Sequence, residues 1–118
     1  MATGDELFKK FRTGGFSALA HSEPLVLARH LDQYSAMSDS RDYREISRML
    51  RSVHEFLLSH DEYGGVRVDF VESLDAVAAR FFRSRISVNE LTDEIEAMLR
   101  DYRFMMRFSV NLWHHAEA

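Results

Sequence analysis

Histidines are the residues of this chain with the widest chemical repertoire, since they bind metals and accept phosphoryl groups. The chain has six histidines and no cysteine. A helical zinc site needs two histidines three or four residues apart, and a di-iron bundle needs Glu-x-x-His. Neither pattern occurs: His21 and His30 are nine residues apart, His54 and His60 are six apart, and the other pair is adjacent. We therefore expect no metal site and no cofactor.

Two histidines have neighbours that suit phosphoryl transfer. Residues 17–25 (SALAHSEPL) resemble the phosphoacceptor box of sensor histidine kinases, in which an acidic residue follows the histidine and Pro-Leu comes a few residues later. Here Glu23 is two residues after His21, and Pro24 follows at once. His54 has the adjacent acidic residue but no proline. The resemblance implies an alternative function, a histidine phosphotransfer or kinase-dimerisation-like module that uses His21 or His54.

Signatures of other catalytic chemistry are missing from the sequence. No serine lies in a Gly-x-Ser-x-Gly elbow, and Gly64-Gly65 alone does not make a phosphate-binding loop. The carboxylates Asp93, Glu94 and Glu96 belong to a charged helical stretch, which is typical of a solvated helix face. We therefore expect that the protein is not an enzyme.

Four arginines form the best candidate for a binding surface. They recur at steps of three, four and three residues, which places them within about 80° on a helix, opposite its apolar face. Guanidinium groups bind carboxylates and phosphates in a bidentate manner. We expect this stripe to contact a protein partner, with nucleic acid as the alternative; its members are Arg41, Arg44, Arg48 and Arg51.

The C-terminal region has an apolar stripe that is longer than its expected partner helices can cover. A helix over residues 88–115 would be roughly 42 Å long at 1.5 Å per residue. Uncovered apolar side chains on such a helix commonly mark an interface, and a twofold contact needs only one patch. We therefore expect a homodimer whose interface includes Met105, Met106, Val110, Leu112 and Trp113.

The distribution of chain-breaking residues predicts helices as the elements that position these groups. Five glycines and one proline leave residues 25–63 and 66–118 without either residue type. Apolar residues at steps of three and four predict helices over about 23–37, 41–59 and 88–115. A fourth helix begins at Val66 or Asp69, although alternation over Val66–Phe70 also fits a short strand. A short N-terminal helix ends before a Gly-Gly linker, so that residues 1–15 form one segment of a single domain spanning 1–118.

Two helix starts have specific sequence signatures. Ser87 and Glu90 form a capping box, because the serine can accept from the Glu90 N–H while the glutamate accepts from the serine N–H. Thr3 and Glu6 repeat the pattern at the N-terminus. Both pairs predict that a helix begins directly after the capping residue.

Composition limits the class of protein. The 118 residues are 46% hydrophobic and 29% charged, with a formal net charge of −4, which is a globular balance without a general basic coat. No apolar run approaches the roughly 18 residues of a membrane span, and the N-terminus lacks an apolar signal core. We expect a cytoplasmic all-α protein, an antiparallel helical bundle of four main helices plus a short N-terminal helix, with a long C-terminal helix. The expected function is that of a small regulatory or adaptor protein that acts by binding another macromolecule, and a helical bundle that binds a small ligand is a further alternative.

Overall fold

The structure, a computed structural model of the whole chain, describes residues 3–20, 22–38, 41–59 and 68–117, with side chains as far as Arg103 except those of Ser38 and Val68. Every element within these ranges is helical, so the fold is all-α as predicted. No helix of this described part is long and apolar enough to cross a membrane. The elements are α1 (Gly4–Gly14), η1 (Phe16–Ala18), α2 (Glu23–Ser38), α3 (Arg41–Ser59), α4 (Val68–Phe82) and α5 (Val88–Glu117).

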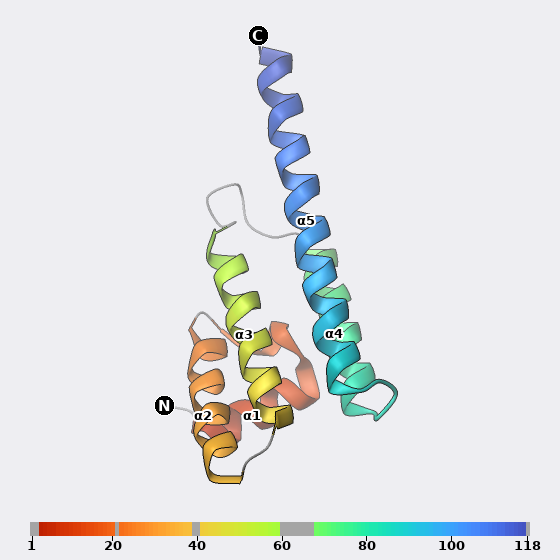
Figure 1. Cartoon of the computed structure of the whole chain (residues 1–118). Helices are drawn as coiled ribbons and strands as arrows, with labels where there is room; N and C mark the ends of the chain where they lie inside the picture. Colours follow the sequence, from red (N-terminus) through yellow and green to blue (C-terminus); the bar gives the residue numbers. More distant parts are fainter. Residues whose placement is uncertain (1–2, 21, 39–40, 60–67, 118) are drawn as a thin grey trace.

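The helices are arranged as two neighbouring pairs. Helices α2 and α3 run in opposite directions side by side, and α4 and α5 do the same (Figure 1). Contacts between α3 and α5 join the two pairs, while α1 packs against both α2 and α4. The α4 helix includes residues 68–70, so this part of the ambiguous segment is helical, whereas Val66 lies outside the described residues.

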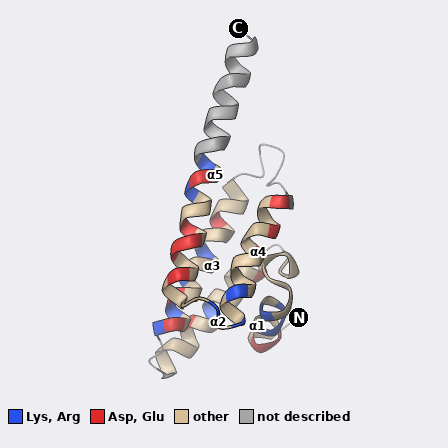
Figure 2. Cartoon of the chain, turned by 90° about the vertical axis from the view of Figure 1, so that its right-hand side faces the viewer, with Lys and Arg blue, Asp and Glu red and all other residues tan. Residues whose placement is uncertain are grey.

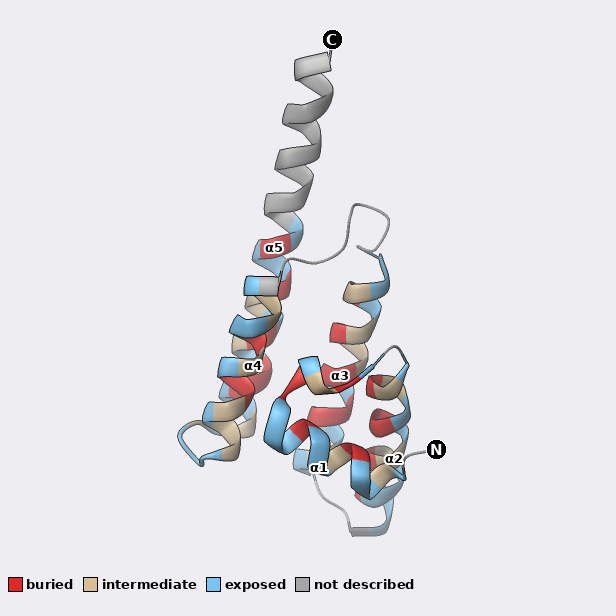
Figure 3. Cartoon of the chain, turned by 180° about the vertical axis from the view of Figure 1, so that it is seen from behind, coloured by how far each residue is buried: buried red, intermediate tan, exposed pale blue. Residues whose placement is uncertain are grey.

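One apolar core joins all five helices. Its largest fully buried side chains include Phe11 from α1, Leu27 from α2, Phe56 from α3, Leu74 from α4 and Ile95 from α5. Buried residues face the interior of the helix arrangement, and exposed residues cover the outside (Figure 3). Burial of such side chains stabilises the fold by roughly 1.5–3 kcal/mol each before the entropy of chain ordering is subtracted.

Both predicted helix starts are confirmed. The Glu90 N–H donates to Ser87 Oγ at 3.1 Å, and the Ser87 N–H donates to Glu90 Oε1 at 3.3 Å. At the first helix, the Glu6 N–H donates to Thr3 Oγ1 at 3.2 Å. These bonds satisfy backbone donors that the first turn of a helix leaves without partners.

The turn after α1 is locked onto α4 by one carboxylate. Gly15 has φ 72° and ψ −157°, a conformation that is essentially restricted to glycine. Asp75 of α4 accepts from the Phe16 N–H at 2.6 Å and from the Ser17 hydroxyl at 2.6 Å. A Cβ atom at Gly15 would lie 2.5 Å from Asp75 Oδ1, so the glycine is also required for this close approach.

A serine performs the corresponding role at the end of α4. Ser84 has φ 59°, in the left-handed region. The Arg85 N–H donates to Arg80 O at 2.8 Å, and the Ser84 N–H donates to Phe81 O at 2.9 Å. This pair of bonds is the Schellman motif, which ends the helix and turns the chain toward α5.

A candidate binding surface on helix α3

All four predicted arginines lie on α3, and they differ in whether they form an ion pair and in how exposed they are. Arg51 forms an ion pair with Asp32 of α2, and Arg48 forms one with Glu45 at 2.8 Å on its own helix. In the described part of the chain neither Arg41 nor Arg44 forms an ion pair, and both side chains are exposed. The exposed members, Arg41, Arg44 and Arg48, are called the arginine face below.

Asp32 links the arginines to the packing of α2 on α3. Its carboxylate is hydrogen-bonded to Arg51 and is within hydrogen-bonding reach of the Ser47 hydroxyl. Ser47 is buried, and its hydroxyl donates to the carbonyl oxygen of Ala28 at 3.0 Å. Arg51 therefore stabilises the α2–α3 pair, and we do not count it as part of the exposed surface.

The charge of Asp32 is maintained by these neighbours. Burial raises the pKa of the carboxyl, but the nearby Ser47 hydroxyl, the hydrogen bond from Arg51 and the positive charges of Arg51 and Arg44 lower it more. The pKa of Asp32 consequently lies below its ordinary value of 3.8. The carboxylate is ionised at neutral pH and compensates part of the positive charge of this region.

An exposed apolar side chain lies at the same end of the α2–α3 pair as the start of the arginine face. Met37, one residue before the end of α2, is 88% exposed. Arg41 is the first residue of α3. Methionine is a flexible side chain that adapts to varied partner surfaces, and arginine is enriched where proteins bind one another. The two residue types together are typical of a protein-binding surface.

The described side chains of α4 and α5 are predominantly acidic, whereas those of α2 and α3 carry as many acidic as basic groups. Acidic segments follow one another along α5 (Figure 2). Glu94 forms an ion pair with Arg80 of α4, while Asp93 and Glu96 are exposed. The cationic groups of the protein are therefore not spread evenly, and an acidic partner would be directed away from α5.

The remaining candidate residues are placed as follows. His54 is half-buried on α3, and His21 lies outside the described residues. In the described part of the chain, no three His, Asp or Glu side chains are grouped so that they could hold a metal ion. The side chains of the predicted dimer interface also lie outside the described part, namely those of Met105, Met106, Val110, Leu112 and Trp113.

Sequence reasoning did not find the contribution of α2 to this surface. Asp32 and Ser47 contact each other only because α2 and α3 pair in one particular register. A lone aspartate in an amphipathic helix gives no sign of such a role. Met37 was likewise indistinguishable from a core methionine by sequence spacing alone.

Comparison with known proteins adds no functional assignment. No family model, no curated protein and no solved structure matches this chain. The arrangement of the chain's own residues is therefore what bears on its function.

Proposed function

We propose that the chain is a small, non-enzymatic regulatory or adaptor protein of the cytoplasm that acts by binding the acidic surface of another protein. The observation that carries this proposal is the arginine face. Three exposed guanidinium groups lie within two turns of one helix, and only Arg48 has an intramolecular ion partner among the described residues.

The support for a partner comes from the difference between Arg51 and the exposed arginines. The Arg51 guanidinium already has a fixed acceptor in Asp32, so its charge is used within the fold. Arg41 and Arg44 form no ion pair among the described residues, although the charge of Arg44 also acts on Asp32. Arginine and carboxylate groups pair in a defined geometry. The carboxylates of a partner surface would therefore provide acceptors for these two guanidinium groups.

We also propose the finer architecture. The antiparallel pairs α2–α3 and α4–α5 would form a four-helix bundle, with α1 across one end and α5 as its long C-terminal helix. The apolar side chains expected near the end of α5 would join two copies in a homodimer. A dimer would present two arginine faces to a partner, which raises the apparent affinity for an acidic surface that can reach both.

The proposal is tested with two variants of equal net charge. In the first variant, Arg41, Arg44 and Arg48 are all replaced by glutamine. The matched control replaces three exposed cations elsewhere in the chain by glutamine, namely Lys9 of α1 and Arg83 and Arg85 of the turn between α4 and α5. Each protein is immobilised and exposed to extract from the source cell, and the retained proteins are compared. We expect the first variant to lose a partner that the wild type and the control retain; identical retained sets would contradict the proposal.

Two further measurements separate the alternatives. Duplex DNA binding to three exposed arginines would give a slope of about −2.7 in a plot of log affinity against log salt. We expect no such binding, and a slope of that size would favour the nucleic-acid alternative. Acid-labile labelling of His21 or His54 by a small phosphodonor would favour phosphotransfer.

A further inference from the structure

A hollow of about 200 Å³ lies where α1, α2 and the beginning of α3 meet. Aromatic rings form most of its lining. The centroid of the His30 ring is 6.0 Å from that of Tyr34, Tyr34 is 5.4 Å from Tyr43, and Tyr43 is 6.4 Å from Phe8. Buried Leu31 also lines the hollow. The four rings therefore follow one another around a space that opens to solvent.

Contacts of the His30 and Phe8 rings with neighbouring residues fix their positions. His30 Nε2 lies 3.1 Å from Asp5 Oδ1. Gly4 accommodates the same ring, because a Cβ at position 4 would lie 2.2 Å from His30 Cγ. Phe8 packs edge-to-face on Phe82 of α4, with ring centroids 6.1 Å apart. A hollow that is shaped before any ligand arrives loses little entropy when it binds one.

One cation lines the hollow without a carboxylate partner. The Arg12 guanidinium lies 5.0 Å from the centroid of the Phe8 ring. Arg12 forms no ion pair within the described ranges, whereas the acid of the hollow, Asp5, is engaged by His30. An anionic group of a ligand would therefore bind at the Arg12 guanidinium. This guanidinium lies beside aromatic surface, where a planar group can pack.

Size restricts the ligand to a single ring. An apolar cavity of roughly 150 Å³ is sufficient for benzene, so 200 Å³ accepts one six-membered ring with a small substituent. Arg12, Phe8 and Tyr43 also line a second hollow of about 380 Å³. Asp42 lines that second hollow, so an anionic ligand long enough to extend into it would meet a negative charge.

We propose that the hollow between α1, α2 and α3 binds a small aromatic anion, a single planar ring that bears a carboxylate or a phosphate. The ring packs against Tyr34, Tyr43 and His30, and the anionic group binds the Arg12 guanidinium. This site is separate in composition from the arginine face, since the two share no residue. It would make the protein responsive to a small metabolite as well as to its partner.

The test is a titration of the wild-type protein followed by NMR of its tyrosine and histidine ring signals. The probes are benzoate and phenyl phosphate, with benzyl alcohol as the neutral and benzyltrimethylammonium as the cationic comparison. We expect dissociation constants on the order of 1 mM for the anions. We expect them to bind at least about ten-fold more tightly than benzyl alcohol. Signals of Tyr34, Tyr43 and His30 should shift together.

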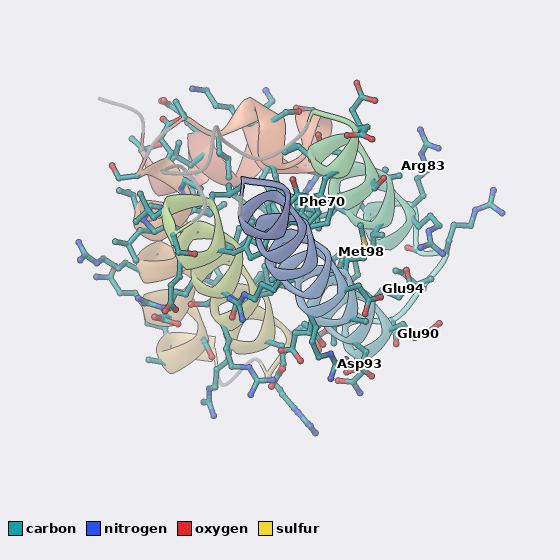
Figure 4. All side chains as sticks on the ribbon, turned by 90° about the horizontal axis from the view of Figure 1, so that it is seen from above. Phe70, Arg83, Glu90, Asp93, Glu94 and Met98 are labelled. Atoms are coloured by element: carbon teal, nitrogen blue, oxygen red, sulfur yellow. The ribbon has the colours of Figure 1, made fainter. Side chains whose placement is uncertain are left out.

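Variants then measure the contribution of the Arg12 charge separately from that of the aromatic rings. Arg12→Met keeps an aliphatic chain over Phe8 and removes the charge, so it should abolish the preference for anions while ring binding persists. Arg12→Gln serves as a second version of the same test. Tyr34→Ala should weaken all probes that bind. Arg83→Met is the matched control and should leave every affinity unchanged, because Arg83, in the turn after α4, points outward from the helices (Figure 4).

Several results would overturn this site. One is the absence of saturable binding of any probe up to about 20 mM. Another is tighter binding of benzyltrimethylammonium than of benzoate. A third is an equal affinity of the wild type and Arg12→Met for the anions. Circular dichroism shows whether each variant retains its helices. The arginine face is intact in all these variants. A negative result for the aromatic anions would therefore not contradict the proposed partner binding, and loss of the partner proposal would not contradict this site.

Discussion

Replacement of Gly15 by alanine should destabilise the protein more than any ordinary surface substitution. The backbone of Gly15 has φ 72° and ψ −157°, and a residue with a Cβ atom pays about 1–3 kcal/mol to adopt such a conformation. The new Cβ would also lie 2.5 Å from Oδ1 and 3.0 Å from Cβ of Asp75. Rotation of the carboxylate alone therefore cannot relieve the overlap completely.

The magnitude follows from the two effects together. If Asp75 moves, its hydrogen bonds from the Phe16 N–H and the Ser17 hydroxyl are lost, at about 1 kcal/mol each. Together with the backbone cost, the free energy of unfolding should fall by about 3–5 kcal/mol. That is a large share of the roughly 5–15 kcal/mol that stabilises a typical domain.

Urea unfolding followed by circular dichroism measures this change, and a double-mutant cycle identifies its cause. Asp75→Ala alone should cost about 2 kcal/mol, because it removes both hydrogen bonds. In the Gly15→Ala background the same change should cost almost nothing, since the bonds are already broken, so the coupling energy should be about 2 kcal/mol. An unfolding free energy of Gly15→Ala within about 1 kcal/mol of wild type would refute the reasoning, as would full additivity of the two changes.

Three other predictions concern a helix cap, a charge and the dimer. Ser87→Ala removes the acceptor of the Glu90 N–H and should lower the unfolding free energy by about 1 kcal/mol, measured by urea denaturation; an unchanged midpoint would contradict the cap. Because the pKa of Asp32 is lowered on folding, its contribution to stability is present above pH 3.8 and is lost as the pH falls through the folded-state pKa. Asp32→Asn should therefore show a smaller loss of stability than wild type when urea unfolding is compared at about pH 5 and about pH 2, and parallel curves would contradict the assignment. Met106→Glu should dissociate the proposed dimer, measured by light scattering, and should retain the helical circular dichroism signal. The reason is that apolar contacts worth roughly 1.5–3 kcal/mol each would be lost only between the two copies. A monomeric wild type would contradict the dimer.

The features that could be predicted from the sequence are those in which cause and effect are a few residues apart. Ser87 and Glu90 are three residues apart, so their reciprocal bonds depend only on the helix that they begin. The bounds of α3 follow in the same way from a polar turn before Arg41 and the loss of periodicity after Ser59. The all-α class follows from long stretches without glycine or proline.

The features that could not be predicted depend on which helices become neighbours. Asp75 and Ser17 are 58 residues apart in the sequence, and no local pattern links them. Tyr34 continues the spacing of the buried residues Leu27 and Leu31 along α2, but it is 48% exposed and packs beside Tyr43. Periodicity assigns a residue to a face of a helix, but it does not say how far a neighbouring helix extends over that face.

The proposal that the arginine face binds a protein partner is tested most directly by the affinity of two charge-matched variants for the protein that the wild type retains from cell extract. The partner is titrated by calorimetry into wild type, into the glutamine variant of Arg41, Arg44 and Arg48, and into the control variant of Lys9, Arg83 and Arg85. Loss of three interfacial charges should weaken binding by at least about ten-fold in the first variant and by less than about two-fold in the control. Equal affinities for both variants would contradict the assignment of the arginine face as the partner-binding surface.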